Sequence, residues 1–165
     1  MLRWLWLSAL VIVLDQITKQ AVDRTMELYE SIEWLPFLHL TYLRNEGAAF
    51  SMLAQAGGWQ RWFFIALAAG ASIGITVWLQ RMPTDNRREA CGWSLVLAGA
   101  LGNLIDRIRY GYVIDFIDFF WPGSDLPHFP AFNVADIAIN IGVALLLIDA
   151  FLQSRRTAAP DRRLG

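Results

Sequence analysis

Four long apolar stretches, separated by more polar segments, set the pattern of the chain. They cover residues 4–22, 62–80, 90–107 and 132–152. About 20 apolar residues in a helix are enough to cross the hydrocarbon core of a bilayer. The pattern therefore predicts an all-α membrane protein with four transmembrane helices, built as a single domain over residues 1–165.

Two longer connecting segments differ in character. In residues 23–61, the stretch from Trp34 to Tyr42 is rich in aromatic and β-branched residues, which favours short strands and turns at the membrane surface. Residues 108–131 contain Pro122, Gly123, Pro127 and Pro130. We expect this second segment to be an irregular loop.

Basic residues indicate the orientation of the spans. If the N-terminus lies inside, the inner side holds eight Lys and Arg residues and the outer side six. The positive-inside rule then places both termini, the loop 81–89 and the tail 153–165 in the cytoplasm, and we expect the tail to be disordered. The segments 23–61 and 108–131 then lie on the outer side of the membrane.

Composition narrows the class of protein. Hydrophobic residues make up 56% of the chain and charged residues 18%, with a mean hydropathy of +0.37, which is too apolar for a soluble domain of this length. The net charge of −1, without a basic face, argues against a nucleic-acid partner. Cys91 is the single cysteine, and neither His39 nor His128 stands in a zinc-ligand spacing, so we expect no metal and no cofactor.

Polar residues in the apolar stretches and in the segments that connect them converge on the predicted outer side of the membrane. Ionisable groups are costly there, and by default they indicate a functional site. The converging set consists of Asp15, Lys19, Asn45, Asn103, Asp106, Arg107, Asp115, Asn133 and Asp136.

Two of these carboxylates suggest a chemistry. Asp115 lies among aromatic residues, and Asn133, Asp136 and Asn140 share one face of the fourth apolar helix. When two carboxyl groups lie a few ångströms apart, one pKa rises and the pair shares a proton. One group can then activate water while the other polarises an amide carbonyl, so Asp115 and Asp136 are candidates for a proteolytic pair.

Each polar group also has a structural interpretation. Asp15 and Lys19, four residues apart, can form an ion pair that lets a span tolerate charge. Asp106 and Arg107 can cap a helix, Asn103 can join two helices, and Asn45 can form a turn. Asp118 is expected to be a solvated loop charge.

Five motifs, read in order, resemble a known family. They are Asp15-Gln-Ile-Thr-Lys19, Arg44-Asn45-Glu-Gly47-Ala-Ala-Phe50, Gly102-Asn103-Leu-Ile-Asp106-Arg107, Val113-Ile-Asp115-Phe116 and Phe132-Asn133-Val-Ala-Asp136. None is specific alone, but together they cover essentially residues 4–152 and resemble the bacterial type II signal peptidases, which process lipoproteins.

The resemblance implies a metal-free aspartic endopeptidase of the bacterial inner membrane, with its outer segments and its active site facing the periplasm. The implied reaction removes the signal peptide from prolipoproteins, cutting before a diacylglyceryl-modified cysteine. It implies catalytic roles for Asp115 and Asp136. It also implies a site lined by Asn45, Asn103, Arg107 and Asn133 and supported by Asp15 and Asp106; we add Lys19 to that support. The implied partners are diacylglyceryl-prolipoproteins, the bilayer and globomycin-type inhibitors, and one chain is sufficient for a complete site.

Two other classes of function remain open on the residues alone. In a proton-coupled transporter, the same aspartates would form a relay, but that predicts polar residues through the membrane depth and an internal repeat. In a non-catalytic bundle subunit, the polar face would dock a partner. Replacing Asp115 or Asp136 by Asn separates these classes, because only a peptidase would lose prolipoprotein processing while staying inserted.

Overall fold

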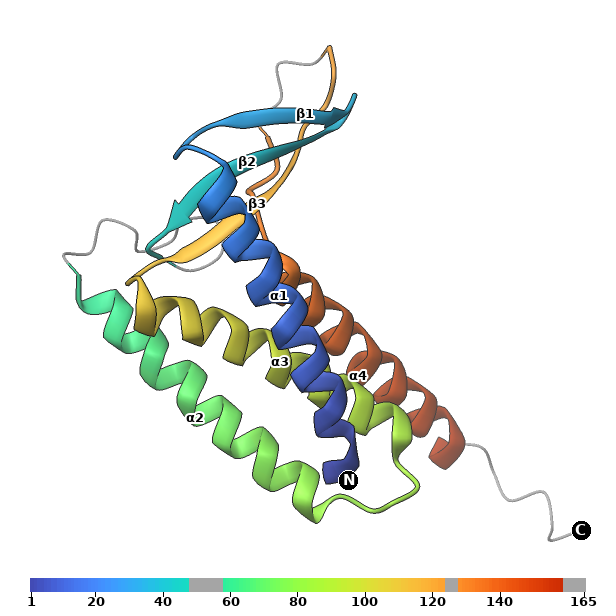
Figure 1. The fold of residues 1–165 in the computed structure, drawn as a ribbon. Helices are drawn as coiled ribbons and strands as arrows, with labels where there is room; N and C mark the ends of the chain where they lie inside the picture. Colours follow the sequence, from blue (N-terminus) through green and yellow to red (C-terminus); the bar gives the residue numbers. More distant parts are fainter. Residues whose placement is uncertain (48–57, 124–127, 159–165) are drawn as a thin grey trace, which may run out of the picture.

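The computed structural model describes residues 1–47, 58–123 and 128–158. Its helices are η1 (Leu2–Trp4), α1 (Leu5–Thr25), α2 (Trp59–Arg81), α3 (Arg87–Arg109) and α4 (Val134–Ala158). Its strands are β1 (Ser31–Leu35), β2 (Leu38–Asn45) and β3 (Val113–Phe119). The strands form a small sheet at one end of the helix bundle, opposite the N-terminus (Figure 1). Ala48, Ala49 and Phe50 of the second motif lie outside the described residues.

Each predicted span corresponds to one of the long helices, but the helices run further. The end of α1 lies three residues beyond the predicted span, and α4 continues to Ala158. The expectation of a disordered tail from residue 153 was therefore wrong for residues 153–158. Gln, Arg and Ala are good helix formers, so they extend α4 past its apolar part.

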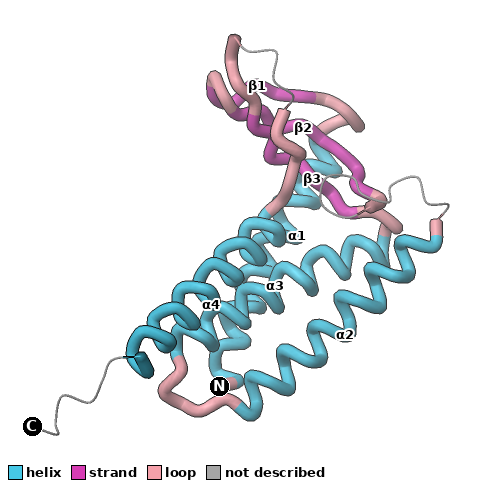
Figure 2. The backbone as a smooth tube through the Cα atoms, turned by 180° about the vertical axis from the view of Figure 1, so that it is seen from behind, coloured by secondary structure: helices cyan, strands magenta, loops and turns pink. Residues whose placement is uncertain are grey.

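Helix α3 is the centre of the bundle. It packs against α1, α2 and α4, and α2 and α4 lie on either side of it (Figure 2). Its buried residues include Ser94, Asn103 and Asp106. The most polar of the four long helices is thus the one that the others surround.

Three helices are long and apolar enough to cross a membrane, over Leu2–Thr25, Trp59–Arg81 and Val134–Arg155. Helix α3 does not meet that criterion among the described residues. The physical reason is its position, because a helix covered by protein on most sides does not need an apolar surface facing lipid.

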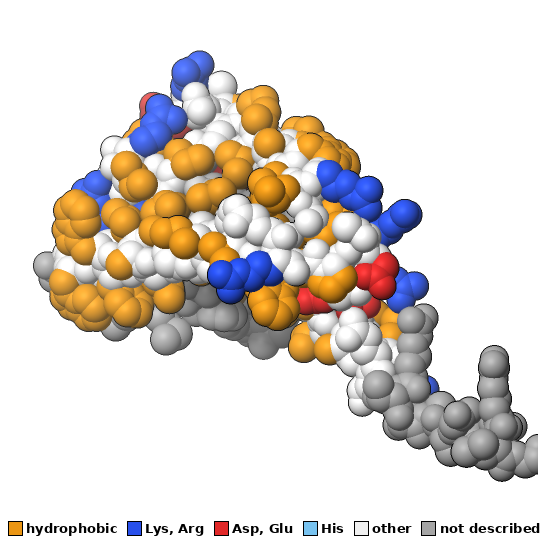
Figure 3. Space-filling view, turned by 90° about the horizontal axis from the view of Figure 1, so that it is seen from below, with side chains coloured by type: hydrophobic (Ala, Val, Ile, Leu, Met, Phe, Trp, Pro, Cys, Tyr) orange, Lys and Arg blue, Asp and Glu red, His pale blue; other side chains and the backbone are white. Residues whose placement is uncertain are grey.

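The bundle buries an apolar cluster around Leu79 and Leu97, and it also exposes many large apolar side chains on its outer surface. Exposed large hydrophobic side chains on the three outer helices include Leu10, Ile17, Trp62, Ile73, Leu147 and Ile148. Seen from the end opposite the sheet, hydrophobic side chains cover much of the surface, with Lys and Arg side chains near its edges (Figure 3). Such a surface suits lipid rather than water.

Small residues let α3 and α4 approach closely. A Cβ added to Gly99 would collide with the carbonyl oxygen of Ala135, and one added to Gly142 would lie 2.7 Å from the carbonyl oxygen of Gly92. On α2, by contrast, a Cβ added to Gly70 or Gly74 meets nothing within 4 Å. The small-residue face of α3 is therefore filled by α4 and leaves no room there for lipid chains.

The sheet has the order β1-β2-β3 and is antiparallel throughout. The prediction of strands between Trp34 and Tyr42 was right, but residues 108–131 are not an irregular loop throughout, because β3 occupies Val113–Phe119. The prolines all follow this strand, and its β-branched and aromatic residues find a partner in β2, which sequence alone did not specify.

The face of β3 that points away from the candidate carboxylate anchors the sheet to α1. Ile114 and Phe116 form a buried cluster with Val22 of α1 and Tyr42 of β2. Because side chains alternate along a strand, Asp115 points to the opposite face from its two neighbours. Burial of Ile114 and Phe116 thus fixes the direction of Asp115.

The close approach of α3 and α4 makes a prediction. Gly99→Ala should lower the stability of the protein in detergent by about 1–3 kcal/mol, because the added methyl group overlaps the α4 backbone. Thermal unfolding followed by circular dichroism measures the effect.

Gly74→Ala is the matched control, since the same change meets open space. Equal midpoints for Gly99→Ala and the wild-type protein would contradict the tight α3–α4 contact.

Candidate active site

Asp115 is buried on β3 and held by two amides. Its side chain is 3% exposed. Asn45 of β2 donates from Nδ2 to Oδ2 at 2.9 Å, and Asn133 donates from Nδ2 to Oδ1 at 2.7 Å. Asn45 also accepts the backbone N–H of Gly47 at 3.0 Å, so it forms the expected turn and also contacts the candidate site.

Asp136 lies in the first turn of α4. Its Oδ2 accepts the backbone N–H of Asn133 at 3.2 Å, and Asn133 Oδ1 accepts the backbone N–H of Asp136 at 3.0 Å. This reciprocal pair caps the helix in the manner of a capping box. The N-terminal end of a helix favours a negative charge, so Asp136 sits where a carboxylate is stabilised.

Two asparagines connect the carboxyl groups. Asn103 of α3 donates to Asp136 Oδ1 at 2.8 Å, and its own Oδ1 accepts from Asn133 Nδ2 at 3.3 Å. Because Asn133 also donates to Asp115, a continuous hydrogen-bonded chain joins the two carboxyl groups. The prediction that these side chains meet at one place in the fold agrees with this geometry.

A buried lysine organises the layer behind the carboxyl groups. Lys19 Nζ lies 2.9 Å from Asp15 and 2.9 Å from Asp106, and it donates to Asn103 Oδ1 at 2.8 Å. The bond to Asn103 Oδ1 turns the amide so that its NH₂ group faces Asp136. The predicted Asp15–Lys19 ion pair therefore exists, and it also orients a residue of the site.

The acidic partners of Lys19 extend the network to other elements. Asp15 Oδ1 accepts the backbone N–H of Ala135 at 2.9 Å, and Asp106 Oδ2 accepts that of Ile114 at 3.2 Å. Gln16 adds a bond from Nε2 to Asp106 Oδ1 at 2.8 Å. Gln16 lies inside the first motif, but it was not singled out from the sequence, because a glutamine beside a charged pair gives no signal of its own.

Arg107 joins α3 to the segment after β2. Its Nη2 donates to the carbonyl oxygen of Gly47 at 2.8 Å, and its guanidinium lies 5.0 Å from the centroid of the Phe64 ring. Arg61 of α2 donates to the carbonyl oxygen of Arg107 at 2.9 Å. Arg107 therefore does more than cap a helix, because it ties three segments together beside the carboxyl groups.

A cavity of about 680 Å³ opens at the two carboxyl groups, and we call it the cleft. Its polar lining comes from Asn45, Asn103, Arg107, Asp115, Asp136 and Asn140. Its apolar lining comes from Phe64, Val113, Phe129, Pro130, Ala131, Phe132, Ile137, Ile139 and Ile141. The sequence did not point to the 129–132 wall, since residues with no unusual chemistry line a cavity only through tertiary contacts.

Burial dominates the electrostatics of Asp115. Burial and, to a smaller extent, the nearby charge of Asp136 raise the pKa of this carboxyl, whereas the Asn45 and Asn133 amides lower it, and the net pKa is about 7. At neutral pH, Asp115 is therefore close to half protonated. Among the described residues, no group of three or more His, Cys, Asp or Glu side chains lies close enough to hold a metal ion.

Asp118 is not the solvated loop charge that the sequence suggested. It lies on β3 with 6% of its surface exposed, accepts a hydrogen bond from Thr41 at 2.9 Å and lies 3.0 Å from His128. It is absent from the lining of the cleft. Its burial follows from β3, an element that the prolines of the segment had obscured.

The structure is therefore that of a multi-pass membrane protein with two neighbouring carboxyl groups in a cleft at one end of its helix bundle. The model of the signal peptidase (SPase) II family matches residues 7–152, and the chain belongs to that family of membrane aspartic peptidases.

Individual relatives agree over nearly the whole chain. A lipoprotein signal peptidase of Shewanella halifaxensis is 52% identical, covering 97% of this chain and 92% of its own length. One of Shewanella woodyi is 54% identical, covering 90% and 83%. A bacterial membrane enzyme solved by the in meso method at 2.3 Å resolution has a TM-score of 0.83 and 35% identity, covering 97% of this chain and 93% of that one.

The Lys19 network makes a prediction. Lys19→Met should destabilise the protein by about 3–5 kcal/mol, because it leaves Asp15 and Asp106 buried without their cation. Thermal unfolding in detergent measures the loss. Arg24→Met, an exposed change on the same helix, is the control, and equal effects of the two substitutions would contradict the role given to Lys19.

The pKa of Asp115 makes a second prediction. The folded protein holds a proton that the unfolded chain has already released, so wild-type stability falls as pH rises from about 4 to about 7. Asp115→Asn removes this titration. The thermal midpoint of the variant relative to that of the wild type should therefore rise as the pH increases from about 4 to about 7.

The measurement is a series of unfolding midpoints against pH, with exposed Glu33→Gln as control. The absolute offset of Asp115→Asn is not diagnostic, because its new NH₂ group faces the amides of Asn45 and Asn133. Parallel curves for wild type and variant would rule out a raised pKa at Asp115.

Proposed function

We propose that the protein removes the signal peptide from diacylglyceryl-modified prolipoproteins, cutting before the lipidated cysteine, with Asp115 and Asp136 as the catalytic pair. The observation that supports this proposal most directly is that the two carboxyl groups line one cleft and are joined by hydrogen bonds through the side chains of Asn103 and Asn133. Family membership supports the cleavage of prolipoprotein signal peptides.

The two carboxyl groups have different environments, and this suggests their roles. Asp115 is buried on a strand with a raised pKa, so it carries the proton and polarises the scissile carbonyl. Asp136 lies at the N-terminus of α4, where the helix dipole favours the ionised form, so it accepts a proton from the attacking water. The proton transferred to Asp136 then protonates the leaving amine.

The remaining polar residues position substrate. Asn103 and Asn133 orient the two carboxyl groups by donating to them. Asn45 holds Asp115 from the sheet, and Asn45 and Asn103 line the cleft, where they can contact a bound peptide backbone. Asn133 was expected to line the site too, but it is fully buried and absent from the lining of the cleft, so it acts through the carboxyl groups. Arg107 also lines the cleft, and we assign its guanidinium to the wall that contacts the substrate.

The position of the site suits a substrate held by lipid. Apolar residues of α4, Ile137 and Ile141, continue the cleft along the outer surface of the bundle. A diacylglyceryl group in the bilayer can therefore lie beside the helices while its cysteine reaches the carboxyl groups. We propose four spans in the inner membrane, with both termini cytoplasmic and the sheet periplasmic, in accord with the count of basic residues.

The proposal extends to domain organisation and partners. A single domain over residues 1–165 is sufficient as a monomer, because every residue assigned to the pair and its support comes from one chain. Globomycin-type inhibitors are expected to bind in the cleft.

A processing assay with purified protein and lipid-modified substrate tests the function. Asp115→Asn and Asp136→Asn should each lower kcat at least about a hundredfold, since general acid–base catalysis contributes on this order. Asp149→Asn, near the opposite end of α4, should leave the rate unchanged.

Activity should also survive a chelator, because the mechanism uses no metal. Loss of activity in chelator, or full activity in either aspartate variant, would overturn the assignment of the pair. A folded variant that still cleaves the substrate but fails to associate with a partner would favour a docking role for the polar face.

A further inference from the structure

One buried carboxylate, Asp118, lies outside both the catalytic pair and the Lys19 network. Asp118 is on β3, three residues after Asp115, with only 8% of its side chain exposed. Its Oδ2 accepts a hydrogen bond from Thr41 Oγ1 at 2.9 Å, and Thr41 is also bonded to Ser31 at 2.8 Å. Burying a carboxylate is costly unless it has hydrogen-bond partners, so the partners of Asp118 stabilise this part of the structure.

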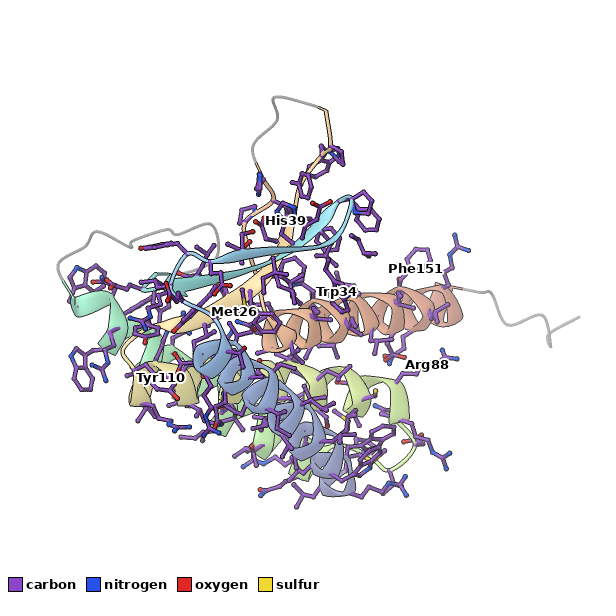
Figure 4. All side chains as sticks on the ribbon, turned by 45° about the horizontal axis from the view of Figure 1, so that its top comes forward. Met26, Trp34, His39, Arg88, Tyr110 and Phe151 are labelled. Carbon is purple, nitrogen blue, oxygen red and sulfur yellow. The ribbon has the colours of Figure 1, made fainter. Side chains whose placement is uncertain are left out.

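The remaining partner of Asp118 is His128. Its Nδ1 lies 3.0 Å from both carboxylate oxygens. The His128 ring stacks on Phe120 at 5.4 Å, and the ring of His39 lies 6.2 Å away. Figure 4 shows His39 on the side of the sheet away from α4 and Trp34 on the side toward it. His39 is the register partner of Asp118 on β2, and Asp118 is absent from the lining of the cleft, so the pair lies apart from the catalytic carboxyl groups.

His128 begins a short segment that forms one wall of the cleft. We call residues 128–132 the return segment, because it runs back along β3 toward α4. Phe129 N donates to the carbonyl oxygen of Phe119 at 2.7 Å, and Phe132 exchanges backbone bonds with Ile117 at 2.9 and 3.1 Å. The next residue is Asn133, which holds Asp115. The return segment thus connects the Asp118–His128 pair to the catalytic pair.

The wall that this segment presents is aromatic. Phe129 packs edge-on against Phe132, Phe132 stacks on Phe119, and the ring centroids are 5.9 Å apart in both pairs. Phe119 stacks in turn on Phe37, at the turn between β1 and β2, at 6.2 Å. A line of rings therefore leads from the cleft outward along the sheet.

A bound substrate chain extends from the cleft in two directions, one on each side of the bond that is cut. Its apolar signal peptide stays with the helices in the bilayer, so the chain after the lipidated cysteine has to pass on the sheet side. We propose that the Asp118–His128 pair is a positioning device for the known reaction: it holds the return segment against β3 as the surface that binds the polypeptide following the lipidated cysteine. This inference rests on the proposed function.

The pair preorganises the return segment for binding. Backbone bonds fix the return segment at Phe129 and Phe132, and the pair fixes its first residue. Without that bond, the segment loses a constraint at the end farthest from Asn133. Binding of an extended peptide then has to order the wall, which weakens affinity and leaves the chemistry at Asp115 and Asp136 unaffected.

The test uses two substrates with the same signal peptide and diacylglyceryl cysteine. One has a long polypeptide after the cysteine, and the other ends a few residues after it. For the long substrate, His128→Ala should raise KM about fivefold, the value of one hydrogen bond, with kcat unchanged. For the short substrate, both constants should stay at the wild-type values.

Two further variants sharpen the result. His128→Asn keeps an N–H donor near the position of Nδ1, so it should restore much of the wild-type KM. Phe129→Ala removes a ring from the wall itself and should reproduce the KM effect if His128→Ala proves unstable. Exposed Glu33→Ala on β1 is the control from the same sheet.

An equal rise in KM for both substrates, or a fall in kcat with KM unchanged, would overturn the proposal, and so would unchanged constants in His128→Ala and Phe129→Ala. The proposed function is judged separately, by whether the wild-type protein cleaves the short substrate and Asp115→Asn does not.

Discussion

One buried ammonium group connects most of the molecule. Lys19 on α1 contacts Asp15, Asp106 and Asn103 while only 1% of its surface is exposed. Through Asp15 it reaches the backbone of α4, through Asp106 the backbone of β3, and through Asn103 the carboxyl group of Asp136. Burying a charge is affordable only when it is fully partnered, so these elements are held in one arrangement.

That arrangement explains why the polar interior lies at one end of the bundle. Gly102 permits the contact, since a Cβ there would lie 2.6 Å from Asp15 Oδ2. Gly102 on α3 thus leaves space for the Asp15 carboxylate of α1, and Gly99 leaves space for the α4 backbone at Ala135. The apolar outer faces of α1, α2 and α4 remain for lipid (Figure 3).

The sheet gives the site its asymmetry. Asp115 comes from a strand whose neighbouring residues are buried against α1, whereas Asp136 comes from the N-terminus of a helix. Two chemically identical side chains therefore meet different local fields, and at Asp115 burial is the largest cause of a pKa raised to about 7. A difference of this kind is what an acid–base pair needs at neutral pH.

Periodicity and composition were sufficient to predict the long helices, because an apolar run of about 20 residues has few other stable forms in a membrane. The order of the five motifs was sufficient to identify the family. β3 could not be predicted, since a strand depends on a partner distant in the chain, and Pro122, Pro127 and Pro130 made residues 108–131 resemble a loop. The burial of Asp118 was missed for the same reason.

The sequence by itself determined which residues are available for chemistry and at which end of the bundle they lie, because the order of the apolar stretches decides at which end each connecting segment and each helix terminus falls. Only the tertiary structure decided how they are oriented. Asn103 faces Asp136 because Lys19 occupies its other side, and Phe129 and Phe132 line the cleft because the return segment pairs with β3. Such contacts join residues far apart in the chain, and local sequence carries no record of them.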